Sequence, residues 1–278
     1  MSTVNTGERQ EDPTRKQRRA QARARRRALE QAQAASAVKR TRLTLLGIVL
    51  AVVVVGIGVV LLTSAGSGGV RKIAPESGEA RKLSGQVTAL LAGIPQNGDA
   101  LGQPTAPVTL QYFGDLECPV CRAFTLGALP PIIQKWVRTG KLRVEYRSLE
   151  TATREPEVFK AQQVAALAAG EQNKMWNFVE TFYHEQQEED TGYVTENFIQ
   201  GIAKQVPGLN LAEWTGNRDD VALANQVASD AQAANSSGLD GTPAFLIGRS
   251  GGGASQLEPS SFTEPGSFNE AIEKLVKS

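Results

Sequence analysis

Apolar positions divide the chain into segments of different character. Residues 1–42 are polar and present no apolar face wide enough for a core, whereas residues 43–63 form an uncharged apolar run of 21 residues. From residue 93 onward, short alternating runs and helical spacings replace this pattern, as in a folded domain. We therefore expect a polar tail over 1–42, an apolar segment over 43–63, a linker or stalk over 64–92 and a globular α/β domain over 93–278.

The first part of the globular region predicts a strand, a helix and a second strand. Alternation and β-forming residues indicate strands at 108–113 and 141–147. The helix between them should run from about 119 to 138, with an interruption near Pro130 and Pro131, because proline breaks a helix interior. This order of elements is typical of a parallel βαβ unit.

The second part is mainly helical and ends in another strand. Over 156–236 an aromatic stripe that contains Trp176 and Tyr183 has helical spacing, which predicts core packing. We expect His184, the only histidine, at the surface, and the acidic run 185–190 as a solvated loop. The other expected elements are helices at 79–92, at 195–206, at 219–234 with Val221, Ala224 and Val227 on one face, and at 268–276, a strand opened by Pro243, and a hairpin turn at 251–253.

The apolar run at 43–63 is long enough to span a bilayer. Lys39, Arg40 and Arg42 directly precede it, so the positive-inside rule places the N-terminus in the cytoplasm and the globular domain outside. A cleaved signal peptide is the competing interpretation, with small residues at Ser64 and Ala65. The run exceeds the roughly 7–15 apolar residues of a signal peptide, which favours an uncleaved single-pass anchor in the cell membrane.

Charge is distributed unevenly between the tail and the rest of the chain. Residues 1–42 hold twelve Lys/Arg and four Asp/Glu, a net of +8, and the remainder holds 18 against 25, a net of −7, which together give +1. We expect a solvated, partly helical or disordered tail, and electrostatic attraction to anionic lipid at the cytoplasmic face is the alternative. The tail lacks interleaved aromatic residues, so we expect no nucleic-acid partner.

Both cysteines of the chain lie in Cys118-Pro119-Val120-Cys121, between the first predicted strand and the helix that follows it. Unpaired N–H groups at a helix N-terminus favour negative charge, so the pKa of a thiol placed there falls. Cys118 is therefore the expected exposed nucleophile, and Cys121 should be more buried and close enough to form a disulfide. Pro119 suits the first helical position because its missing N–H would have had no partner.

Two structural interpretations of the cysteine pair are weaker than the redox one. Structural zinc needs four ligands, and the chain offers two cysteines and one histidine. A fixed disulfide across so short a loop would restrict the unfolded chain very little. A pair that cycles between dithiol and disulfide fits the spacing better, and this chemistry requires no metal or organic cofactor.

A second informative stretch, Gly241-Thr242-Pro243, opens an apolar run. A proline cannot donate to a β-ladder, so it belongs at the first residue of a strand. With this stretch and the Cys-Pro-x-Cys pair, the chain resembles the thioredoxin superfamily, and its DsbA-like branch in particular, over about residues 93–278. The segments 93–98, 106–108 and 115–121 look like the start of that branch's domain. The resemblance implies a thioredoxin fold with a helical insertion at about 152–238, preceded here by one transmembrane helix.

The resemblance also implies a role for each site residue. Cys118 would form the mixed disulfide and Cys121 would resolve it, while Pro243 would be cis beside the sulfurs and Thr242 would present its backbone to a bound peptide. The substrates would be exported proteins that contain cysteines, and a membrane partner would reoxidise the pair.

The chain departs from the DsbA-like pattern at two positions. Val120 stands where the strongly oxidising member has histidine, and valine cannot donate a hydrogen bond to a thiolate. Tyr112 stands where many relatives have an acid, so proton handling falls to water or to another residue, for which Asp115 and Glu117 are candidates by proximity in the sequence. We expect a disulfide-forming or disulfide-exchanging enzyme; a reductase or isomerase of the same fold and a non-catalytic chaperone or adaptor are the alternatives.

Overall fold

The computed structural model describes residues 70–278, the unit that contains both cysteines. The predictions for the polar tail at 1–42 and the anchor at 43–63 lie outside the described residues. Within residues 70–278, no helix combines the length and the apolar character needed to cross a membrane.

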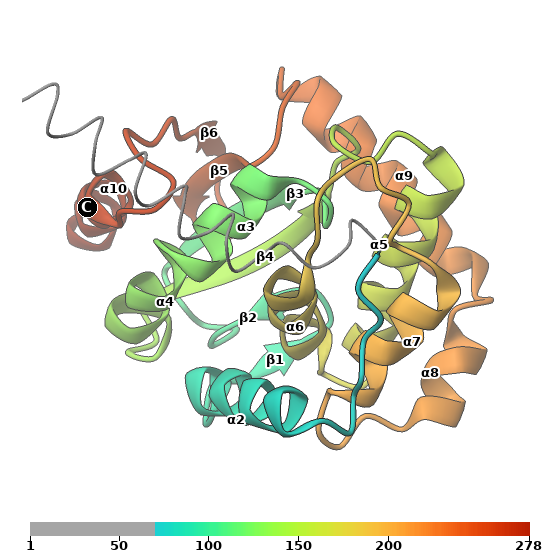
Figure 1. Ribbon diagram of the computed structural model, residues 1–278. Coiled ribbons are helices and arrows are strands. Elements are labelled where there is room, and N and C mark those ends of the chain that lie inside the picture. Colours follow the sequence, from blue (N-terminus) through green and yellow to red (C-terminus); the bar gives the residue numbers. More distant parts are fainter. Residues whose placement is uncertain (1–69) are drawn as a thin grey trace, which may run out of the picture. The chain divides into compact units, whose positions relative to one another are not determined.

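A six-stranded mixed sheet, in the order β1-β2-β4-β3-β5-β6, forms the centre of this unit (Figure 1). The predicted parallel pair is present, with Leu110 of β3 opposite Val144 of β4. β5 runs antiparallel to β3, and β6 extends β5 through the predicted hairpin. The strands are β1 (Gln96–Asn97), β2 (Ala100–Leu101), β3 (Val108–Gly114), β4 (Leu142–Ser148), β5 (Ala244–Arg249) and β6 (Ala254–Gln256).

Helices precede, connect and follow the strands. The insertion between β4 and β5 contains the helices α5 to α9, which gather on one side of the sheet, away from α10 (Figure 1). The helices are α2 (Gly78–Leu91), α3 (Pro119–Leu126), α4 (Leu129–Ile132), the π-helical turn η1 (Ile133–Val137), α5 (Pro156–Gly170), α6 (Met175–Glu185), α7 (Glu196–Lys204), α8 (Leu211–Asn217), α9 (Val221–Ser236) and α10 (Gly266–Lys277). The fold is therefore an α/β thioredoxin-like fold with a helical insertion.

The helical connection between β3 and β4 is interrupted before Pro130 and Pro131, where the sequence predicted the interruption. α3 ends at Leu126, and a Cβ atom at Gly127 would lie 2.6 Å from the Ala123 carbonyl oxygen. Pro130 and Pro131 lie in the first turn of α4. N–H groups of a first turn have no partner within the helix, so the missing N–H of proline costs no hydrogen bond there. The prolines thus begin a new helix and do not kink the old one.

α2 belongs to the folded unit and is not a free stalk. Its Val87 and Leu91 side chains are buried in the main core. The Arg138 guanidinium donates to the carbonyl oxygens of Leu90 and Ala92, at 2.8 and 2.7 Å, which caps the end of the helix. The packed chain therefore begins before residue 93, where we expected the domain to start.

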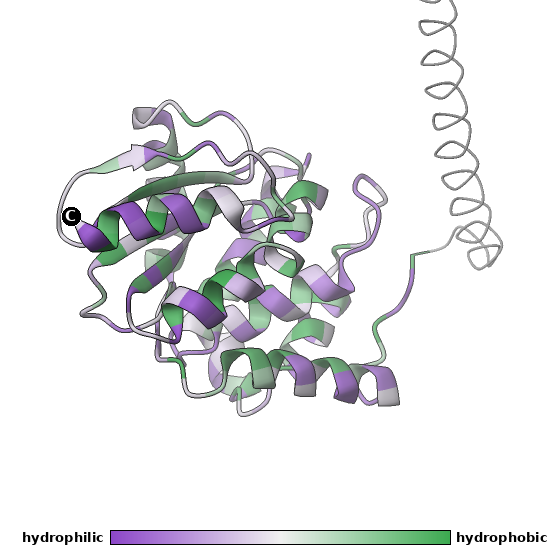
Figure 2. Cartoon of the chain, turned by 90° about the vertical axis from the view of Figure 1, so that its left-hand side faces the viewer, coloured by the Kyte–Doolittle hydropathy of each residue, from purple (hydrophilic) through white to green (hydrophobic). Residues whose placement is uncertain are grey.

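The sequence pattern identified most of the buried faces of the insertion. Trp176 and Tyr183 of the aromatic stripe are fully buried, and His184 is exposed, as predicted. Val221 is 69% exposed, so it does not share the buried face of α9, which Leu223 and Val227 form. Hydropathy alternates along the C-terminal helix α10 in Figure 2. Phe268 and Ile272 are the buried residues of this helix.

Candidate active site

The two cysteines lie where β3 leads into α3, as predicted. Cys118 is the N-cap residue of α3, and its sulfur accepts a hydrogen bond from the Cys121 N–H at 3.4 Å. Pro119 occupies the first turn, where its lack of an N–H costs nothing. The Val120 side chain is 39% exposed, so it faces solvent beside the sulfurs.

The two thiols differ sharply in acidity. Hydrogen bonding to Cys121 lowers the pKa of Cys118 to about 6, although burial opposes this shift. Burial is the main reason that the pKa of Cys121 is raised well above its ordinary value. Cys118 is only 5% exposed, so the nucleophile that we expected to be exposed is nearly buried. At neutral pH the pair therefore holds a thiolate at Cys118 and a thiol at Cys121.

Thr242, which directly precedes Pro243, lies against the first cysteine. The Thr242–Pro243 peptide bond is cis, as the resemblance implied. The Cys118 sulfur lies 3.4 Å from the Thr242 carbonyl oxygen, to which its thiol form donates. The structure thus brings together residues that are more than a hundred positions apart in the sequence.

Asp115, which sequence reasoning named as a candidate for proton handling, instead holds a loop. Its carboxylate accepts five hydrogen bonds, one from the Glu117 N–H and four from residues 151–153 that follow β4. The Thr151 hydroxyl in turn contacts the Thr242 hydroxyl. Sequence reasoning missed Thr151 and Thr153, because nothing in the local pattern pairs them with Asp115.

Glu117 directly precedes Cys118 in the sequence, but it lines a cavity away from the two sulfurs. Burial raises the pKa of Glu117 to about 7. It lines a cavity of about 360 Å³ together with Thr153, Asp190 and Val194. No hydrogen bond joins Glu117 to either sulfur in the described part of the chain, so it stays a candidate by position only.

Three fully buried tyrosines lie beneath the cysteine pair. The Tyr112 hydroxyl lies 3.2 Å from the Thr125 hydroxyl and 3.4 Å from the Cys121 carbonyl oxygen. Tyr112 donates to the Tyr183 hydroxyl at 3.1 Å, which donates to the Asp115 carbonyl oxygen at 3.1 Å. Burial raises the pKa of Tyr112, Tyr183 and Tyr146 well above the ordinary value. Where the DsbA-like pattern has an acid, this protein therefore has the neutral hydroxyl of Tyr112, which belongs to a hydrogen-bonded network.

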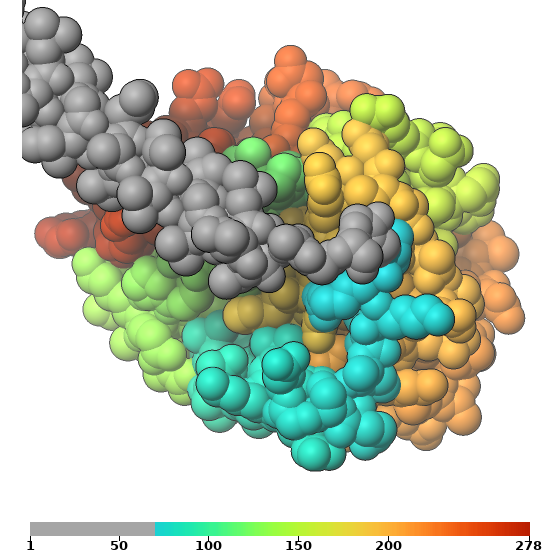
Figure 3. All heavy atoms as spheres, in the orientation of Figure 1, coloured from blue at the N-terminus to red at the C-terminus, as the bar shows by residue number. Residues whose placement is uncertain are grey.

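The run 185–190, expected as a solvated loop, is partly buried. The Gln186 side chain donates to the carbonyl oxygens of Leu116 and Cys118, at 2.8 and 3.1 Å, and so holds the turn before α3. Glu185 pairs with Arg71 at 2.7 Å, which fixes residues near 70 against this run, and the two segments touch in Figure 3. The polar composition of the run hid these contacts from sequence reasoning.

Glu180 on α6 is the one carboxyl of residues 70–278 that is fully buried with neither oxygen hydrogen-bonded. Burial raises its pKa to about 8. It lies one helical turn before Tyr183. The side chain is therefore a neutral acid at pH 7.

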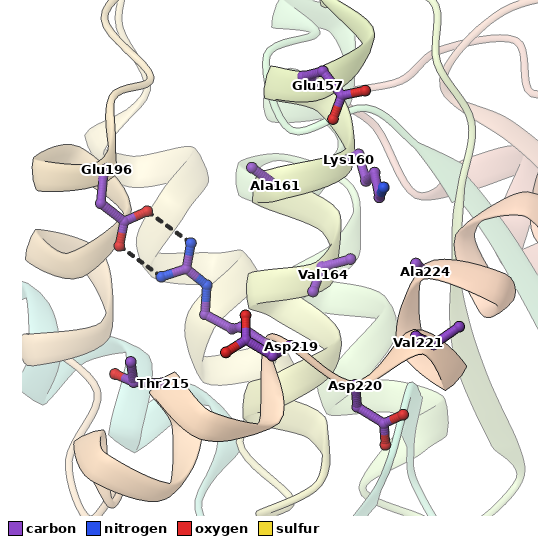
Figure 4. A pocket seen from close by; sticks show the side chains of 11 residues that line it. Glu157, Lys160, Ala161, Val164, Glu196, Thr215, Asp219, Asp220, Val221 and Ala224 are labelled. Carbon is purple, nitrogen blue, oxygen red and sulfur yellow. Dashed lines mark hydrogen bonds and ion pairs between the residues drawn. The ribbon is translucent and has the colours of Figure 1, made fainter.

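A larger hollow than the one beside Glu117 lies away from the cysteines, among α5, α7, α8 and α9. Its volume is about 460 Å³ (Figure 4). Arg218 and Glu196 form a two-bond ion pair across it, with both distances 2.7 Å. In the described region, no group of three or more His, Cys, Asp or Glu side chains is placed to hold a metal ion.

Comparison with known proteins agrees with this geometry. Disulfide bond formation protein D of Bacillus subtilis is 24% identical over 182 residues, which are 64% of this chain and 76% of the relative. The crystal structure of oxidised BdbD from Bacillus subtilis has a TM-score of 0.56 at 21% identity and covers 68% of this chain and 98% of that chain. Wolbachia pipientis alpha-DsbA1 gives 0.54 at 20% identity, with 67% and 92% covered. The family described as Thioredoxin matches residues 96–258, more than half of the chain, and the protein belongs to this family.

Proposed function

We propose that this protein is a thiol–disulfide oxidoreductase that forms or exchanges disulfides in exported proteins. The observation that carries the proposal is the Cys118 sulfur, which accepts the Cys121 N–H at a helix N-terminus and lies 3.4 Å from the Thr242 carbonyl oxygen. A sulfur placed in this way is stabilised as a thiolate, which is the form that enters and leaves mixed disulfides. Relatives named disulfide bond formation protein support the same chemistry.

The oxidising reaction takes two exchange steps. A substrate thiolate attacks the Cys118 sulfur of the oxidised pair, the Cys118–Cys121 bond breaks, and Cys121 leaves and takes up a proton. A second substrate thiolate then attacks the substrate sulfur of the mixed disulfide and releases Cys118 as a thiolate. The substrate loses two electrons and the cysteine pair gains them. The low pKa of Cys118 favours the last step because a more acidic thiol leaves faster.

The proposed site of action is the outer side of the cell membrane. The apolar run at 43–63 and the preceding Lys39, Arg40 and Arg42 support a single-pass anchor in membrane lipid, with the catalytic domain extracytoplasmic. Disulfides persist in that compartment. The reduced pair must pass its two electrons to an oxidant, so a membrane partner completes the cycle.

The two cysteines give different variants that test the proposal. In the full-length protein, Cys118→Ser should abolish oxidation of a reduced protein substrate, and Cys121→Ser should accumulate a covalent complex that reductant dissolves. Mass spectrometry of the complex would identify the substrate cysteine joined to Cys118. If Cys118→Ser complements a deletion strain as well as the unchanged protein, the chain acts as a chaperone or adaptor and the proposal is wrong.

Val120 favours a second candidate, a reductase or isomerase of the same fold. Its side chain cannot donate a hydrogen bond to the Cys118 thiolate, which leaves the reduced pair less stabilised than a histidine would. The redox potential separates the two candidates: about −120 mV corresponds to a strong oxidant and about −270 mV to a reductant. Val120→His should move the potential toward the oxidising value.

A further inference from the structure

We propose that the groove beside Thr242 and Pro243 selects substrate segments in which a lysine or arginine lies next to the reacting cysteine. This inference rests on the proposed function and specifies its substrate class. The groove has a volume of about 320 Å³ and lies between the start of β5, the end of β6 and the loop that reaches Phe262. It adjoins the sulfur, since Thr242 both lines the groove and contacts Cys118.

The groove is lined by both apolar and acidic residues. Phe245, Leu257 and Phe262 line it, and so do the exposed residues Asp240 and Glu258. No lysine or arginine is among its lining residues. Neither carboxylate forms an ion pair within residues 70–278, unlike Glu196 in the larger hollow. Both negative charges are therefore free to meet a ligand.

Lysine and arginine side chains match such a groove in both of their parts. Their aliphatic stems pack on apolar surface while the charged head reaches polar groups. Asp240 lies two positions before Thr242 and lines the same groove, so it is the acidic residue nearest in the sequence to the residue that contacts the Cys118 sulfur. The net charge of the described region agrees, because residues 70–278 carry 18 basic and 25 acidic side chains. A negatively charged cleft raises the encounter rate with positively charged ligands.

Three peptides that differ at one position test the inference. Each carries two reduced cysteines, and the residue beside the first is lysine, methionine or glutamate. The full-length oxidised protein should oxidise the lysine peptide with a kcat/KM about three- to tenfold above that of the glutamate peptide, as two exposed ion pairs would give. The ratio should fall toward one at about 1 M salt, where the screening length is short.

Matched variants separate the groove from net charge. The double variant Asp240→Asn/Glu258→Gln should reduce the lysine-to-glutamate ratio to within about twofold of one. Glu171→Gln/Asp219→Asn removes the same charge from exposed positions of the insertion and should keep the full ratio. An unchanged ratio in the groove variant, or a methionine peptide preferred to the lysine peptide, overturns the inference. Equal oxidation of all peptides leaves the proposed function standing, whereas oxidation of none contradicts the proposed function as well.

Discussion

Asp115 and Thr153 are joined by two hydrogen bonds, from the Thr153 N–H at 2.9 Å and from its hydroxyl at 2.6 Å. The same carboxylate also accepts the N–H groups of Thr151 and Ala152, at 3.0 and 2.8 Å. The turn before the cysteines and the turn after β4 are thus fastened to one side chain.

Asp115→Asn should lower the free energy of unfolding by about 2–4 kcal/mol, because an amide accepts at only one of its two ends and leaves buried N–H groups unpaired. Denaturant titration measures the loss, and hydrogen exchange at residues 151–153 should become faster. Asp219→Asn, at an exposed position, is the matched control and should change stability by less than about 0.5 kcal/mol. Equal stability of the two variants would show that the Asp115 contacts contribute nothing.

The reduced protein should show a thiolate that titrates near pH 6, which is the pKa of Cys118. Ultraviolet absorbance of the thiolate, or the rate of alkylation against pH, measures it, and Cys118→Ser should abolish the transition. Because the folded pKa lies below the ordinary 9.0, this thiolate stabilises the reduced fold fully above about pH 9 and not below about pH 6. A midpoint near 9 would contradict the helix N-terminus argument.

The unchanged protein should lose stability as the pH rises, and the variant Glu180→Gln should not show this loss. Burial raises the pKa of Glu180 from 4.5 to about 8, so the folded state holds a proton that the unfolded state releases. The stabilising contribution is complete below pH 4.5 and is lost as the pH rises through about 8, on the order of 5 kcal/mol over that window. Unfolding titrations at several pH values measure the slope; the same slope in both proteins would assign it to other groups.

Tyr112→Phe should destabilise the fold by about 1–2 kcal/mol, since the buried Thr125 hydroxyl loses its phenolic partner. The phenyl ring keeps its packing against Phe124 and Phe245. Tyr193→Phe is the matched control, because the buried Tyr193 hydroxyl has no partner within residues 70–278. Its removal should cost nothing measurable by denaturant titration, and an equal loss in both variants would mean that the Tyr112 network has no specific role.

Local pattern was sufficient for the parallel pair of strands, the helix start at Cys118 and the strand after Pro243, because each depends on neighbours in the sequence. It was insufficient for contacts between residues that lie far apart in the sequence. Thr153 lies 38 positions from Asp115, and Gln186 lies 68 positions from Cys118, so only the folded chain reveals these contacts. The exposure of Val221 and the burial of Glu180 go against residue type, and packing of the helical insertion decides both.

The contact between the Thr151 and Thr242 hydroxyls connects this fastened turn to the loop that faces Cys118. The backbone beside the Cys118 sulfur is therefore held by the same hydrogen bonds that fasten the turn after β4. If the protein binds a peptide there, as we propose, association would remove freedom mainly from the peptide. Under the proposed function, a loop held in this way lets peptides differ in affinity through the side chains that they place in the groove, and not through the cost of ordering the loop.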